Sequence, residues 1–120
     1  MCIRDRLWGR AKGAVLGIGA PTPTRDALAR GIPFDDAVFD QAAGDVCLNF
    51  FAPDGAPVEF PGSERMVRTS REVLAGVPHA VGVAVGAAKV PSIVGAVRAR
   101  MINELVTDAA TARALLDALA

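Results

Sequence analysis

The second half of the chain alternates between continuous apolar runs and segments with helical spacing. "REVLAGV" (71–77) predicts a short helix, and "HAVGVAVG" (79–86) is an apolar run with the length of a buried central strand. "AKVPSIVGAVRARM" (88–101) has an apolar stripe at helical spacing and a proline that the first helical turn accepts. "INELV" (102–106) predicts a further strand, and "TDAATARALLDALA" (107–120) predicts a closing helix. Crossovers of this length predict parallel strands.

The first half of the chain has shorter elements. "GAVLGIGAP" (13–21) predicts a buried strand that runs into a loop. The two segments that follow, 22–33 and 34–44, predict short helices, the second with the weaker pattern. "DVCLNFFAPDGAPVEF" (45–60) predicts a β-hairpin that turns at residues 53–55, where Pro-Asp-Gly favours a turn.

The composition fits one small α/β domain. The chain has 120 residues, of which 52% are hydrophobic and 5% aromatic, so Val, Ala, Leu and Ile would form its core. We therefore predict an α/β fold, a parallel sheet with flanking helices and an inserted β-hairpin.

The charge balance argues against a DNA-contacting domain. Lys and Arg number 13, as do Asp and Glu, and the basic residues are spread along the chain, whereas proteins that grip phosphates show a basic excess. The apolar runs are broken well short of a membrane span, and the N-terminus has charges where a secretory signal would be apolar. We expect a cytoplasmic domain with no membrane partner.

The residues that usually carry metal or nucleophile chemistry are sparse. The two cysteines, Cys2 and Cys47, have no zinc-type or disulfide-type spacing, and we interpret Cys47 as a small buried hydrophobe. The single histidine, His79, is interpreted as a surface residue at the start of a strand. No catalytic set can be assembled, so we expect no enzyme activity, no metal and no cofactor.

The first residues, "MCIRDR" (1–6), have no hydrophobic period and lead into no predicted element. They have the look of a translated sequencing adapter, and a native frayed terminus is the alternative. We expect residues 1–12 to be a non-native or disordered stretch and residues 13–120 to form the domain.

Lys89 lies where the helix after the central strand should begin, although helix starts favour negative charge. In open parallel sheets, ligands bind beyond the carboxyl ends of the strands, where helix N–H groups point outward. Gly86, Ala87 and Ala88 leave the backbone uncovered at this point. Two interpretations stay open: an anion site assisted by the lysine, or a solvated lysine that tolerates a small dipole penalty.

Other polar positions also have two interpretations. Asp45 follows Gly44 at the start of a strand and either accepts hydrogen bonds from sugar hydroxyls or caps the preceding turn. The glycines around Ile18 resemble part of a dinucleotide fingerprint but lack the glycine that opens a helix, which favours a plain loop. Thr107 and Asp108 are interpreted as a helix cap.

Three segments in order and spacing resemble the C-terminal half of the sugar-binding domain of SorC-family (DeoR-like) bacterial transcriptional regulators. They are "GAVLGIGAP", "GDVCLNFFAPDGAPV" and "GVAVGAAKVPSIVGAVRARMINELVTDAATARALL". The likeness covers nearly all of the chain after about residue 13, and "MINELVTDAATARALL" is its most distinctive part.

The resemblance implies a fold similar to ribose-phosphate isomerases and glucosamine-phosphate deaminases, of which this chain would be a partial domain. It implies a phosphorylated sugar effector, with Lys89 on the phosphate, Asp45 on sugar hydroxyls and the backbone of Gly86 and Ala87 lining the phosphate loop. It also implies a homo-oligomer, a dimer or tetramer, when the protein is full length. Operator DNA would be bound only through an N-terminal helix-turn-helix that is absent here.

Two other functions are kept open. A sugar-phosphate isomerase or deaminase of the related fold would need an acid/base pair, for which only Asp45 and His79 are available. A plain interaction module with an unused cleft is the third candidate.

Overall fold

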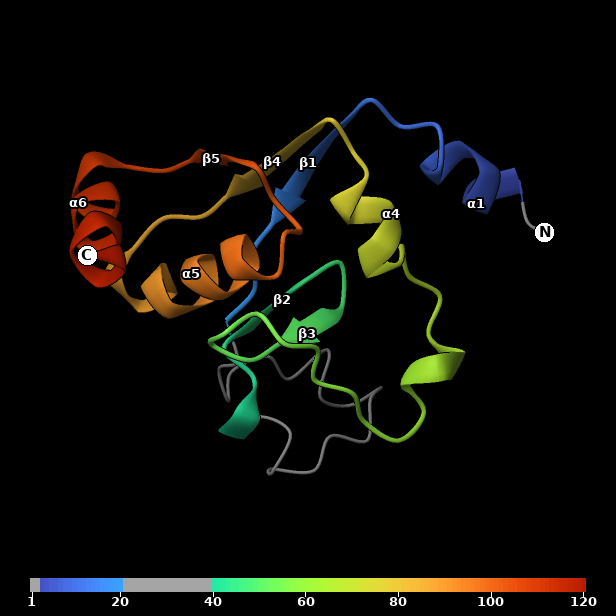
Figure 1. The fold of residues 1–120 in the computed structure, drawn as a ribbon, viewed down its shortest axis with the longest axis horizontal. Coiled ribbons are helices and arrows are strands. Elements are labelled where there is room, and N and C mark those ends of the chain that lie inside the picture. The colour runs from blue at the N-terminus through green and yellow to red at the C-terminus, as the bar shows by residue number, and fades with distance from the viewer. Residues whose placement is uncertain (1–2, 21–39) are drawn as a thin grey trace.

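A three-stranded parallel sheet organises the fold. The computed structural model describes residues 3–20 and 40–120. Strands β1 (Gly13–Gly17), β4 (His79–Val83) and β5 (Glu104–Val106) lie side by side in the order β1-β4-β5 (Figure 1). Both pairs are parallel, with Gly13 opposite His79 and Val81 opposite Glu104. The α/β prediction and the parallel direction of these strands are therefore confirmed.

Helices α4 (Arg71–Ala75), α5 (Val90–Arg98) and α6 (Ala109–Leu119) fall where the apolar periodicity predicts them, whereas α1 (Ile3–Trp8) was not predicted. Short 3-10 turns are present at η1 (Ser63–Arg65) and η2 (Ala87–Lys89). The predicted helix at 88–101 begins as a 3-10 turn, and Pro91 lies in the first turn of α5, where its missing N–H costs no helical hydrogen bond. None of the helices described has the length and apolarity that a membrane crossing requires.

Helix α5 covers one face of the sheet (Figure 1). Its buried side chains Ile93 and Ala96 are fully shielded from solvent and belong to the main hydrophobic core with Leu16 of β1 and Ala80 of β4. Burial of this stripe stabilises the domain by roughly 1.5–3 kcal/mol for each large side chain. The core is aliphatic apart from Phe51, as the composition predicts.

The inserted hairpin is present, and it contains a turn that the sequence did not predict. Strands β2 (Gly44–Val46) and β3 (Asn49–Phe51) are antiparallel and are joined at Cys47 and Leu48, whose φ angles of 49° and 62° are left-handed. The Asn49 side-chain amide holds this turn by donating to the carbonyls of Val46 (3.1 Å) and Cys47 (3.2 Å). Cys47 is therefore exposed rather than a buried hydrophobe.

The Pro-Asp-Gly segment at 53–55 forms a second turn beyond β3. The N–H of Gly55 donates to the carbonyl of Ala52 at 2.8 Å, and the Asp54 carboxylate accepts the N–H of Ala56 at 2.9 Å. The chain then returns along β3, where Phe51 and Pro57 form an isolated bridge. The predicted turn at 53–55 is therefore confirmed, and the turn at Cys47 and Leu48 precedes it.

The N-terminal stretch differs from the expectation of no element. Helix α1 covers Ile3–Trp8, and the Arg4 guanidinium lies 4.8 Å from the centre of the Trp8 ring. None of its residues is buried, which explains why no hydrophobic period marks it. Whether residues 1–6 are native stays a prediction. The helices predicted within 22–33 and 34–44 lie outside the described residues, except for a short helical stretch at 40–41.

The second face of the sheet carries three exposed valines beside the polar His79–Glu104 pair. Val15 is 80% exposed, Val83 41% and Val106 57%, and the strand register places them on the side opposite α5. No helix of the described part of the chain lies over this face (Figure 1). An exposed apolar surface next to a free strand edge favours association.

We expect the isolated chain to self-associate through this bare face. Replacing Val15 and Val106 together by Thr keeps the β-branched shape and removes apolar surface, so the association constant should fall about tenfold. Sedimentation velocity over a concentration series measures it. Val97→Thr, which changes an exposed valine (44%) on α5, is the matched control. Equal weakening by the control, or none by the double variant, would show that this face is not responsible.

Candidate functional site

The side chain of Lys89 and the backbone of Asp45, two residues predicted to bind a ligand, converge on the segment just beyond the carboxyl end of β1. The ammonium of Lys89 donates to the carbonyl of Ile18 at 2.8 Å. The next residue, Gly19, exchanges two backbone hydrogen bonds with Asp45, N–H to carbonyl at 2.8 Å and carbonyl to N–H at 3.1 Å. Lys89 and Asp45, which are 44 positions apart in the sequence, are thus bonded to two adjacent residues, Ile18 and Gly19.

A close approach of backbones makes this convergence possible. A Cβ on Gly44 would lie 2.9 Å from the Ser92 Cβ and closer still to the Gly19 carbonyl oxygen. The buried Ser92 hydroxyl donates to the carbonyl of Ala43 at 2.7 Å and so ties α5 to the start of β2. Only glycine at position 44 lets the three segments meet.

The turn before α5 presents positive charge to solvent. Gly86 has φ 111°, and an added Cβ there would meet nothing within 4 Å. The N–H groups of Ala87 and Ala88 open η2 and have no acceptor within the part of the chain that the structure describes. Lys89 follows as the N-cap residue of α5, whose first turn contains no acidic residue.

Lys89 has a carbonyl partner and no carboxylate partner among residues 3–20 and 40–120. It is half-buried, so its charge is partly removed from water without being neutralised. A lysine that is simply solvated would have no fixed acceptor, and Lys89 has one.

The N–H of Gly86 is already in use. It donates to the hydroxyl of Thr111, in the first turn of α6, at 2.9 Å. Of the two backbone groups expected to line a phosphate loop, Ala87 therefore keeps an available N–H, and Gly86 acts as the flexible point of the turn. Sequence reasoning missed Thr111, which is only 2% exposed; the available signal was a threonine three residues after the capping aspartate, on an alanine-rich helix.

Asp45 is buried, at 7% exposure, within β2. Its Oδ2 accepts the N–H of Leu48 at 3.3 Å, so the carboxylate holds the turn that follows Asp45, whereas the sequence interpretation had it cap the preceding turn. Desolvation of the thiol, followed by the negative charge of Asp45, raises the pKa of Cys47. The sulfur is thus held in its neutral form near the carboxylate.

The acid/base pair that an enzyme of the related fold would need is not brought together. His79 starts β4 opposite Gly13, whereas Asp45 pairs with Gly19, beyond the other end of β1. Six residues of extended chain separate the two positions by about 20 Å. His79 is exposed, and its Nδ1 lies 2.7 Å from Glu104 Oε1, which confirms that it is a surface residue.

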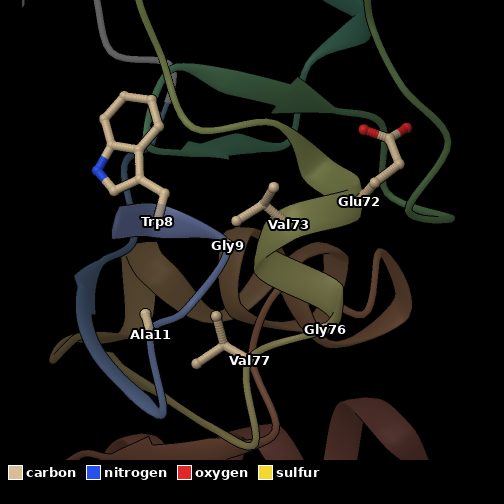
Figure 2. Close-up of a pocket in the computed structure, with 7 residues that line it drawn as sticks. All are labelled: Trp8, Gly9, Ala11, Glu72, Val73, Gly76 and Val77. Atoms are coloured by element: carbon tan, nitrogen blue, oxygen red, sulfur yellow. The ribbon is translucent and has the colours of Figure 1, made fainter. Parts of the chain in front are cut away.

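A cavity of about 310 Å³ lies at the opposite end of the sheet, between α1 and α4. Figure 2 shows the Trp8 ring, Val73 and Val77 around it, with Glu72 at its edge. It adjoins the chain just before β1 and β4, the amino ends of these strands. Ligands of open parallel sheets bind at the carboxyl ends, so this cavity is not our candidate site.

Comparison with known proteins identifies the architecture around Lys89 and Asp45. Residues 5–117 match the family model described as "Putative sugar-binding domain". The chain belongs to this sugar-binding-domain family. It is 33% identical over 114 residues to the sorbitol operon regulator of Klebsiella pneumoniae and 36% identical over 113 residues to the transcriptional regulator LsrR of the same species.

The solved structures agree. The sugar-binding domain superposes with a TM-score of 0.82 on the probable sor operon regulator of Shigella flexneri, at 35% identity over 92% of this chain and 44% of that one. The full-length sorbitol operon regulator SorC of Klebsiella pneumoniae gives the same TM-score at 31% identity, over 92% of this chain and 37% of that one. The resemblance to SorC-family regulators is therefore confirmed.

The chain spans about a third of the length of the curated relatives it matches, 36% and 35%. The match therefore establishes that this chain belongs to the sugar-binding-domain family and has its fold.

Gly44→Ala should destabilise the domain by about 1–3 kcal/mol, because the new methyl group has to displace the Gly19 backbone or Ser92. Urea unfolding followed by circular dichroism measures it. Gly17→Ala is the control, since an added Cβ there meets nothing within 4 Å and the change should be neutral or slightly stabilising. Similar values for both variants would contradict the close packing at position 44.

Asp108 should make the stability depend on pH. Its Oδ1 accepts the Thr111 N–H at 2.7 Å, and this backbone hydrogen bond lowers the pKa of the carboxyl below its ordinary value of 3.8. The stabilisation is therefore fully present above pH 3.8 and is lost as the pH falls through the lower folded-state value. Thermal unfolding of the wild type and Asp108→Ala should differ most near neutral pH and converge in acid; a difference that stays constant would contradict this.

Proposed function

We propose that this domain is the effector-sensing part of a bacterial transcriptional regulator and that it binds a phosphorylated sugar. The phosphate lies at the turn formed by Gly86, Ala87 and Lys89, and Asp45 accepts hydrogen bonds from sugar hydroxyls. The observation that carries the proposal is Lys89, a half-buried cation without a carboxylate partner in the described residues, at the carboxyl edge of a parallel sheet.

The physical chemistry of this turn suits a phosphate. The N–H groups of Ala87 and Ala88 lie at the start of a helical segment, where the peptide dipoles favour negative charge. The Lys89 ammonium has three donors, of which one is used by Ile18, so it can bond a phosphate oxygen without losing its anchor. Charge-assisted hydrogen bonds of this kind are the strong ones.

Asp45 is placed to select the sugar. Its backbone is fixed by Gly19, next to the residue that anchors Lys89, so one ligand can reach both side chains. A carboxylate accepts several hydrogen bonds at once, so its bond to the Leu48 N–H is compatible with a sugar hydroxyl.

The remaining properties belong to the whole protein. Its relatives are named as operon and transcriptional regulators, and we propose that operator DNA is bound by a region beyond these residues, which carry no net charge. We also propose a cytoplasmic homo-oligomer without catalytic activity. The separation of Asp45 from His79 supports regulation over the isomerase or deaminase alternative.

Lys89→Ala should weaken the binding of phosphorylated sugars by about 10–100-fold, the value of one charge-assisted hydrogen bond. Free sugars should be affected much less, because they lack the group that the ammonium contacts. Thermal shift and calorimetry with matched pairs of sugars and sugar phosphates, on the protein completed to the length of its relatives, measure the difference.

Asp45→Asn is the companion variant. It should weaken the binding of a free sugar and of its phosphorylated form by similar factors, because both ligands have the hydroxyl groups that Asp45 would contact. An equal loss for both ligand types in Lys89→Ala would remove the phosphate role, and no response of the wild type to any sugar phosphate would contradict the proposed function.

A further inference from the structure

A chain of three hydrogen bonds connects α6 to the turn that carries the proposed phosphate site. Asp108 Oδ1 accepts the N–H of Thr111 at 2.7 Å, and Oδ2 accepts the Thr111 hydroxyl at 3.1 Å. The Thr111 hydroxyl in turn accepts the N–H of Gly86 at 2.9 Å. The contact joins residues 25 positions apart, so it is a tertiary tether as well as a helix cap.

The direction of this chain is determined by the donors and acceptors. A threonine hydroxyl has one hydrogen and two lone pairs. The carboxylate only accepts, so the hydrogen points to Asp108 and a lone pair is left for the Gly86 N–H. Thr111 is 2% exposed, so water cannot readily replace either partner.

The turn needs a tether from outside. Gly86 has no side chain, and the space next to its Cα is open, so packing does not fix it. Its other hydrogen bond within the described part of the chain is local, from the Lys89 N–H to the Gly86 carbonyl at 3.0 Å. A glycine at φ 111° is also free to adopt other conformations.

We propose that Asp108 and Thr111 are positioning residues, which hold the Gly86–Lys89 turn so that the N–H groups of Ala87 and Ala88 and the Lys89 ammonium face one anion. This inference rests on the proposed function. It makes α6 part of the effector site although no α6 side chain contacts the ligand. Because coupling is reciprocal, an anion at the turn stabilises the first turn of α6.

A purely structural cap gives a different pattern of results. If Thr111 only caps α6, its loss frays the helix and leaves anion affinity unchanged. If Thr111 positions the turn, its loss both frees the Gly86 N–H and lowers the affinity of the turn for an anion. Measuring the amide exchange of Gly86 and the anion affinity in the same sample therefore separates the two roles.

The test uses ¹⁵N-labelled chain and inorganic phosphate as the probe. In Thr111→Val, amide exchange of Gly86 should accelerate about tenfold or more, and the phosphate dissociation constant, read from the amide shifts of Ala87, Ala88 and Lys89, should rise about three- to tenfold. Thr111→Ser keeps the hydroxyl and should restore both values.

Thr107→Val is the matched control. The Thr107 hydroxyl oxygen is buried four residues earlier and has no hydrogen-bond partner among the described residues, so its loss should change neither quantity. Asp108→Asn provides a second variant if Thr111→Val does not fold. Its amide presents a donor where the carboxylate only accepts, so the Thr111 hydroxyl reorients and both quantities shift in the direction seen for Thr111→Val.

The outcomes are distinct. Phosphate affinity that is unchanged in Thr111→Val and Asp108→Asn, with a wild type that binds, overturns the positioning role and leaves the proposed function standing. A wild type whose turn amides do not respond to phosphate overturns both. Equal effects of Thr107→Val and Thr111→Val would show that the changes come from a general loss of stability and not from the Thr111–Gly86 hydrogen bond, which would overturn the inference.

Discussion

The site depends on two consecutive residues that follow the first strand of the sheet. Ile18 gives its carbonyl to the Lys89 ammonium, and Gly19 pairs its backbone with Asp45. The strand is fixed by its neighbour β4, so this segment has one position in space. Lys89 at the start of α5 and Asp45 in the inserted hairpin are both attached to this segment. Their shared attachment is the basis of the proposal that a lysine and an aspartate from distant parts of the sequence bind one ligand.

The two ends of the sheet have different chemistry. At the carboxyl end, the Lys89 ammonium bonds the carbonyl of Ile18, the buried Asp45 pairs with the next residue, Gly19, and the turn that begins at Gly86 leads into α5. At the amino end, the exposed His79–Glu104 pair and an apolar cavity beside Trp8 offer no comparable concentration of anion donors. We therefore propose the site at the carboxyl end for a physical reason, because ligands of open parallel sheets bind where strands end and helices begin.

The regular elements could be predicted from the sequence because they follow from local periodicity. The central strand, α5, β5, α6 and its Asp108 cap all lie where the apolar spacing places them. The turn at Cys47 and Leu48 could not be predicted, since neither residue favours a left-handed conformation and the Asn49 side chain and tertiary packing impose it. The burial of Cys47 was predicted wrongly for the same reason. An apolar run predicts buried side chains, but Cys47 lies in the turn and its side chain is exposed.

The candidate site divides in the same way. Lys89 and Asp45 stand out in the sequence because their types conflict with their positions. The two hydroxyls that hold the site, Ser92 and Thr111, do not, because each acts on a partner tens of residues away and a short polar side chain normally predicts exposure. Buried hydroxyls of this kind become visible only once the fold is known.

The most direct measurement is a crystal structure of the protein bound to a sugar phosphate. The account predicts phosphate oxygens within hydrogen-bonding distance of the Lys89 ammonium and of the Ala87 and Ala88 N–H groups, with the Thr111–Gly86 bond retained. A phosphate bound elsewhere, for example in the cavity beside Trp8, with Lys89 still bonded only to Ile18, would contradict it.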